Sequence, residues 1–141
     1  MTLGTKSWGS REWVREVAEL CRRHEVPAPV RNIVLNIVLG DERREFLGEM
    51  CISVRRYRVA DVRPSCSDRA RVTLFMSEKL SRDLWLRADH EAGFRALYEG
   101  GLRVVGDGSA LGPLRHWCMF GEASAVRSAL AAEPSEGDLD D

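Results

Sequence analysis

Residues 97–107 read LYEGGLRVVGD, and this stretch decides how the second half of the chain is organised. Gly100 and Gly101 follow apolar residues at helical spacing, which is typical of a helix that ends at a glycine. Leu102–Val105 is a short β-branched run, and the glycines on either side of Asp107 favour a turn. The stretch therefore predicts the end of a helix, a strand and a turn in direct succession.

Upstream of this stretch, the sequence predicts a strand followed by two helices. Apolar residues at every second position of residues 72–76 predict the strand. Ser77 is suited to cap a helix that runs to about Ala88. Asp89 can cap a second helix, which carries Phe94 on its apolar face. A strand, a helix pair and a further strand thus follow one another.

One helix begins the predicted fold. Ser10 is suited to cap it, and apolar residues recur at helical spacing from Trp13 to Cys21. His24 and the prolines at positions 27 and 29 end it, because proline does not continue a helix.

Three strands are predicted between this helix and Pro64. Residues 32–39 are rich in β-branched side chains, and residues 44–54 alternate between apolar and polar. The phase of the alternation changes at Arg55-Arg56, which indicates a tight turn or bulge before a third strand. Because the links between successive strands are short, including the one at residues 65–68, we expect antiparallel hairpins.

After residue 107 the sequence predicts a helix that Ser109 caps and that reaches Cys118. An Ala-rich segment, residues 121–132, follows. Its only large apolar residues are Val126 and Leu130, so we expect it to be weakly held and able to act as a lid.

The composition fits one folded domain. The chain has 141 residues, of which 44% are hydrophobic and 30% charged. We expect an N-terminal tail at residues 1–9, a domain at residues 10–132 and an acidic disordered tail at residues 133–141. A net charge of −1 gives no positive field that would bind nucleic acid. No secretory signal and no run of about 18 apolar residues is present, which predicts cytoplasmic localisation without membrane insertion.

Two stretches, residues 72–78 and residues 97–107, together resemble the second half of the sterol carrier protein type 2 family. The residues at the spacing of that family's last strand and its exit are Gly100, Leu102, Val104, Gly106 and Asp107. The predicted order of elements agrees from Ser10 to Cys118. The resemblance implies an α+β fold in which helices cover one side of a five-stranded, largely antiparallel sheet.

The resemblance also implies a function, the binding of a lipid, sterol or other hydrophobic small molecule without covalent chemistry or cofactor. The ligand would lie in an apolar tunnel between sheet and helices, where each buried methylene contributes about 0.8 kcal/mol. Each candidate contact can equally be an ordinary core residue. The candidates are Val72, Leu74, Met76, Leu80, Leu84, Trp85, Phe94, Leu97, Leu102, Val104, Leu111, Leu114 and Trp117.

Two other functions stay open at this point. A tailoring enzyme, cyclase-like, could use the same scaffold on an apolar biosynthetic intermediate, with His116, His90 or Tyr57 as acid or base. It requires a polar group deep in the cavity. A dimerisation or accessory module with a filled core, such as a homodimer, is the third hypothesis.

Polar clusters elsewhere carry weaker hypotheses. Four arginines, Arg55, Arg56, Arg58 and Arg63, form a basic rim that could bind an anionic head group or protect an edge strand from aggregation. Cysteine and histidine recur at Cys21/His24 and at His116/Cys118, but the spacing matches no structural zinc pattern, so we expect no metal site. Cys118 and His116 with Asp83 or Asp107 would supply a nucleophile, a base and an acid, although no catalytic motif joins them.

Overall fold

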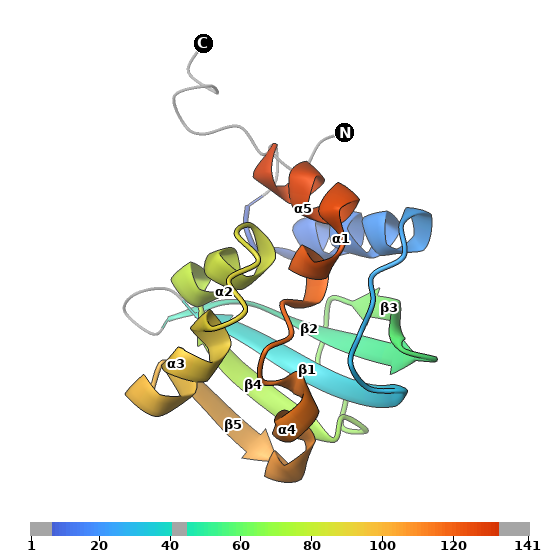
Figure 1. Cartoon of the computed structure of the whole chain (residues 1–141). Coiled ribbons are helices and arrows are strands. Elements are labelled where there is room, and N and C mark those ends of the chain that lie inside the picture. The colour runs from blue at the N-terminus through green and yellow to red at the C-terminus, as the bar shows by residue number, and fades with distance from the viewer. Residues whose placement is uncertain (1–6, 41–44, 133–141) are drawn as a thin grey trace.

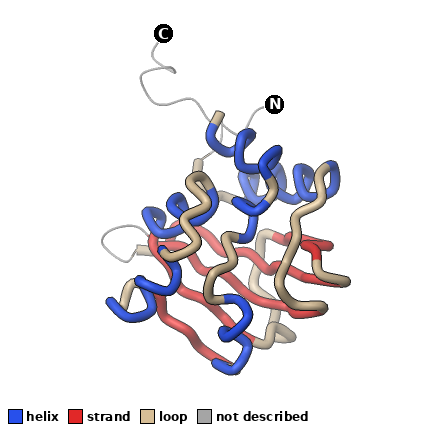
Figure 2. The backbone as a smooth tube through the Cα atoms, viewed as in Figure 1, coloured by secondary structure: helices blue, strands red, loops and turns tan. Residues whose placement is uncertain are grey.

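The computed structural model describes residues 7–40 and 45–132 (Figures 1 and 2). The predicted tail at residues 133–141 and most of the tail at residues 1–9 lie outside these ranges. Helices and strands follow in the order α1 (Arg11–Arg23), β1 (Asn32–Gly40), β2 (Phe46–Arg55), β3 (Arg58–Arg63), β4 (Val72–Ser77), α2 (Glu78–Trp85), α3 (Ala92–Glu99), β5 (Leu102–Gly106), η2 (Gly108–Ala110), α4 (Leu111–Leu114), η3 (Met119–Glu122) and α5 (Ser124–Ala131).

One mixed sheet organises the fold, with the strand order β3-β2-β1-β4-β5. The pair β1–β4 is parallel, and the other neighbouring pairs are antiparallel. Helices gather on one face of the sheet, and the segment from α4 to α5 crosses that face (Figures 1 and 2). The predicted α+β class with a five-stranded, largely antiparallel sheet is confirmed.

The predicted hairpin between the third and fourth strands is wrong. The chain leaves β3 at one edge of the sheet and returns on the far side of β1, where Leu35 pairs with Val72. Asn36, in the middle of β1 and only 5% exposed, holds the connection in place. Its Nδ2 donates to Ser67 O at 2.9 Å and to Thr73 Oγ1 at 3.2 Å, and its Oδ1 accepts from Ser67 N at 2.9 Å. These hydrogen bonds between Asn36 and Ser67, 31 positions apart and here called the clamp, hold β4 beside β1. The short link between β3 and β4 therefore does not form the antiparallel hairpin that its length predicts.

The predicted helix starts and the tight turn agree with the structure in several places. Ser10 Oγ accepts from Trp13 N at 3.2 Å, and Ser77 Oγ accepts from Leu80 N at 3.0 Å. Arg56 and Tyr57 adopt φ values of 54° and 65°, so a turn of left-handed residues joins β2 to β3. Gly100, with φ 80°, ends α3 as predicted.

The predicted helix at residues 109–118 is largely wrong. Only the turns η2 and α4 form there, and Asp107, not Ser109, supplies the cap, because its Oδ1 accepts from Ser109 N at 3.0 Å. Gly112 and Pro113 are the poorest helix formers, and they interrupt this segment. The chain therefore continues from Leu114 as an irregular segment.

An aromatic cluster of Trp8, Trp13, Trp85 and Phe120 fills the core between α1 and α2. Trp85 lies 5.9 Å from Trp8, 5.8 Å from Trp13 and 5.1 Å from Phe120 between ring centroids. Trp8 Nε1 donates to Ser81 Oγ at 3.0 Å. Trp8 falls in the stretch predicted as an N-terminal tail, and the structure places it in the core.

The expectation of a weakly held lid at residues 121–132 is wrong. Val126 and Leu130 are buried, and α5 packs near α1 and η3. In Figure 1, α5 lies beside α1, at the opposite end of the molecule from α4. Within the described residues, no helix has the length and apolar character needed to cross a membrane.

Candidate functional site

An apolar pocket lies between the β4–β5 side of the sheet and the segment that runs from α3 to η3. Its volume is about 40 Å³. Its lining comprises Leu74, Met76, Leu84, Gly93, Phe94, Leu97, Leu102, Leu111, Leu114, Arg115, Trp117 and Met119. Among these residues Arg115 alone is charged, so the interior is hydrocarbon and aromatic.

Most of the predicted contacts line this pocket, and a few lie elsewhere. Trp85 belongs to the aromatic cluster, and Leu80 is a buried residue of the core. Val72 and Val104 pack against the core without lining the pocket. The helical and strand spacing identifies apolar faces, but it does not reveal which part of a face is filled by neighbouring side chains.

Three lining residues escaped the sequence analysis: Gly93, Arg115 and Met119. A Cβ on Gly93 would lie 3.5 Å from Arg115 O and 3.7 Å from Leu84 Cδ2, so the glycine leaves open a small space. Arg115 lies in the irregular segment after α4 and Met119 begins the short η3, and neither place has a periodicity that assigns a residue to a face. The sequence feature that could have identified them as lining residues is their position close to Leu114 and Trp117.

Two polar contacts fix the wall that the irregular segment provides. The Trp117 indole Nε1 donates to Pro27 O at 2.9 Å, which ties this wall to the chain before β1. The Arg115 guanidinium lies 6.0 Å from the centroid of the Phe94 ring, at the outer limit of a cation–π contact. Arg115 is exposed, so its charge lies at the solvent side of the pocket.

The opposite wall, α3, is held by few contacts. Ala92 and Gly93 are its only buried residues, whereas Leu97 is 40% exposed and Tyr98 is 80% exposed. A helix with so little buried surface moves outward at a lower cost in free energy than a helix anchored in the core.

The predicted basic rim does not border the pocket. Its arginines lie on β2, β3 and the turn between them, whereas β4 and β5 form the other side of the sheet. Arg58 pairs with Glu25 at 3.1 Å, and Arg63 pairs with Asp61 at 2.7 Å. The rim therefore cannot meet the head group of a molecule in the pocket.

The three residues suggested as acid or base also lie outside the pocket. Tyr57 is 57% exposed in the β2–β3 turn. His116 Nδ1 lies 3.0 Å from His90 O, so its ring contacts the loop before α3. His90 Nε2 lies 3.1 Å from Glu122 Oε1.

The suggested nucleophile, base and acid are not brought together. Asp83 pairs with Arg87, and Asp107 pairs with Arg71 at 2.7 Å. Hydrogen bonds from Ser109 and Arg71 lower the pKa of Asp107 to about 2. Burial raises the pKa of the Cys118 thiol to about 12, so at neutral pH it is protonated and a poor nucleophile.

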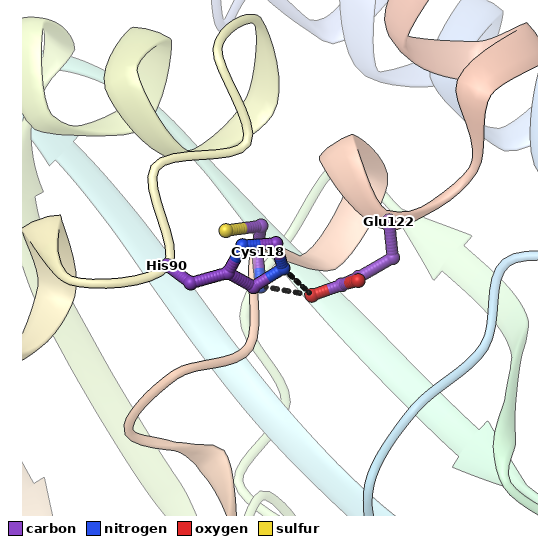
Figure 3. A group of neighbouring side chains, drawn as sticks. All are labelled: His90, Cys118 and Glu122. Carbon is purple, nitrogen blue, oxygen red and sulfur yellow. Dashed lines mark hydrogen bonds and ion pairs between the residues drawn. The ribbon is translucent and has the colours of Figure 1, made fainter.

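Cys118 instead lies beside His90 and Glu122 (Figure 3). One ligand atom of each residue falls within 4.8 Å of those of the other two. This group differs from the pairings considered from the sequence, in which Cys118 was matched with His116, and it includes neither Cys21 nor His24.

Comparison with known proteins finds similarity in structure only. No family model matches the sequence, and a search of curated proteins finds no relative. Sterol carrier protein domain 2 of Helicoverpa armigera is 14% identical with a TM-score of 0.49, over 88% of this chain and 90% of that one. Sterol carrier protein 2 of Yarrowia lipolytica is 12% identical with a TM-score of 0.47, over 79% of this chain and 80% of that one.

A larger enzyme contains a similar part. The sec-alkylsulfatase of a Pseudomonas species is 20% identical with a TM-score of 0.43, over 60% of this chain, and the match spans only 12% of the enzyme. At such identities the likeness concerns the fold and leaves the ligand to be argued from the pocket. In the arrangement of its strands and helices, the chain is similar to sterol carrier protein 2 structures.

Proposed function

We propose that the chain reversibly binds a slender apolar molecule, such as the hydrocarbon tail of a lipid, in the apolar pocket. The observation that carries this proposal is the lining, in which Arg115 is the one charged side chain and stands at the solvent side. Pockets for small hydrophobic ligands combine such a surface with a few polar groups that orient the ligand.

The volume of the pocket limits how binding occurs. About 40 Å³ accommodates about three water molecules, which is far less than a lipid tail needs. Binding therefore includes an outward movement of α3, the wall with the least buried surface. The apolar side chains of Phe94 and Leu97, which lie one turn apart on α3 and line the pocket, then cover the ligand.

The position of Arg115 favours a ligand with an anionic end. A carboxylate at the solvent side accepts charge-assisted hydrogen bonds from the guanidinium while the tail points inward. The proposed ligand class is thus an acyl chain with a carboxylate head.

The apolar character of the lining also argues against the enzyme hypothesis. Cyclisation of an apolar intermediate requires an acid or base that reaches the substrate. Tyr57, His90 and His116 all lie outside the lining. The arrangement supports binding rather than catalysis by these residues.

Filling the pocket should weaken binding. We expect Leu97→Trp to lower the affinity for a fluorescent fatty-acid probe at least about tenfold, because the larger ring occupies the space that the tail needs. Leu97 is partly exposed, so the variant should fold. The matched control is Tyr98→Trp, one residue along α3 and outside the lining, with unchanged affinity. Equal affinity of the Leu97→Trp variant and the wild type would place the ligand elsewhere.

Replacing Arg115 should change the preference for head groups. We expect Arg115→Gln to lower the affinity for a long-chain fatty acid about tenfold, which is the effect of losing one charge-assisted hydrogen bond. The affinity for the matching fatty alcohol should not change. Titration calorimetry with both ligands measures this difference. Arg103→Gln, which changes an arginine stacked on Phe75, is the control. Parallel losses for acid and alcohol would contradict a head-group contact.

A further inference from the structure

A second group of side chains lies next to the apolar pocket, where the irregular segment after α4 meets η3. Trp117 and Met119 line the pocket, and Cys118 between them contacts a different set of residues. His90 comes from the loop before α3, and Glu122 ends η3 (Figure 3). Three side chains of different chemistry, separated by up to 32 positions, thus converge on one place.

We propose that His90, Cys118 and Glu122 bind a divalent transition-metal ion, Zn²⁺ in preference to Mg²⁺ or Ca²⁺. Imidazole nitrogen, thiolate sulfur and carboxylate oxygen are the three ligand types that proteins use for zinc. Sulfur and imidazole select against the hard cations, which prefer oxygen.

The geometry is close to that of a zinc site. The three ligand atoms lie within 4.8 Å of one another, whereas tetrahedral zinc with bonds of about 2.0–2.3 Å separates its ligands by roughly 3.5 Å. Small side-chain rotations close this difference. Binding of the ion displaces the proton of the Cys118 thiol, after which the ligands together carry two negative charges and a divalent ion gives a neutral group in a partly buried place.

Two of the three ligands are held in position before any ion binds. Glu122 Oε1 accepts from Cys118 N at 2.9 Å, which fixes the carboxylate over the turn that carries the thiol. Gly121 packs so tightly that a Cβ would lie 2.3 Å from Leu84 O, and this contact presses the turn against α2. The same Oε1 of Glu122 lies 3.1 Å from His90 Nε2, so an ion that binds here replaces the contact between these two ligands.

The third ligand comes from a loop that a neighbouring side chain supports. His116 Nδ1 lies 3.0 Å from His90 O, so His116 supports the backbone of the loop that carries this ligand. The side chain of His90 is 52% exposed, so an ion can enter from solvent. Three protein ligands leave a fourth position for water or another small ligand, as in zinc sites that are not closed.

Cobalt titration tests this site. We expect the reduced, metal-free full chain to bind one Co²⁺, to show an absorption band from charge transfer between thiolate and cobalt, and to lose the band when Zn²⁺ is added. The Cys118→Ser variant should lack the band. Absence of the band at stoichiometric Co²⁺ in the wild type, or its persistence in the variant, would overturn the proposal.

A second variant guards against misfolding of the Cys118→Ser protein, in which the substituted position is buried. His90→Gln changes an exposed side chain. We expect it to lower the affinity for Co²⁺ and Zn²⁺ at least about tenfold and to leave the circular dichroism spectrum unchanged. The matched control is Cys66→Ser, because Cys66 N donates to Glu49 Oε2 at 2.6 Å and thus also pairs a cysteine with a carboxylate. We expect unchanged affinity for this control. Equal metal affinity in wild type and His90→Gln, or loss of the band in Cys66→Ser, would refute the assignment.

Discussion

Replacing Trp85 with alanine is expected to lower the free energy of unfolding by about 3–5 kcal/mol, because a fully buried indole leaves a large cavity behind. Trp85 is the centre of the aromatic cluster and contacts Trp8, Trp13 and Phe120. Few substitutions in a domain of this size have a larger effect. Urea unfolding followed by far-ultraviolet circular dichroism measures the change.

A phenylalanine at the same position separates packing from hydrogen bonding. Trp85 Nε1 has no hydrogen-bond partner within the described part of the chain, so Trp85→Phe forfeits no polar contact and should cost about 2 kcal/mol or less. Trp8 is the comparison, because Trp8→Phe removes the hydrogen bond to Ser81 as well. A loss below about 1 kcal/mol for Trp85→Ala would mean that the cluster does not anchor the core.

The second large effect is expected at Asn36. Asn36→Ala leaves the half-buried N–H of Ser67 without its partner, whereas the Ser67 carbonyl still accepts from Ala70 N at 3.3 Å. Because one orphaned group costs about 1–3 kcal/mol, we expect a loss of about 2–3 kcal/mol. Hydrogen exchange should show lost protection of the Ser67 amide.

Thr73→Val is the matched control for Asn36. It removes only the 3.2 Å contact between Asn36 Nδ2 and Thr73 Oγ1, and about 1 kcal/mol is expected. If Asn36→Ala costs no more than this control, the clamp does not hold the crossing from β3 to β4.

Local chemistry explains which parts of the fold were predictable. Ser10 and Ser77 cap their helices, and the turn at Arg56-Tyr57 reverses the chain, because each depends on residues close in sequence. The position of β4 depends on Asn36 and Ser67 instead. A polar residue inside an apolar strand was the visible sign, but its partner lay 31 positions away.

In the candidate sites, too, the features that depend on residues close in sequence were predictable, and those that depend on distant residues were not. Alternation within β4 correctly placed Leu74 and Met76 on the face that lines the pocket. Arg115 lies where helix α4 has already ended, so periodicity gave no information about it. The association of His90 with Cys118 and Glu122 needs the folded chain, since α2, which precedes the loop of His90, packs against η3.

The parallel pairing of β1 with β4 has a consequence for synthesis of the chain. A nascent polypeptide emerges from the ribosome N-terminus first, so β1, β2 and β3 become available while one side of β1 still lacks its neighbour. An open strand edge of this apolar kind recruits foreign strands. Translation of β4 ends that vulnerable interval, and a pause placed before Val72 would prolong it and raise the yield of aggregates.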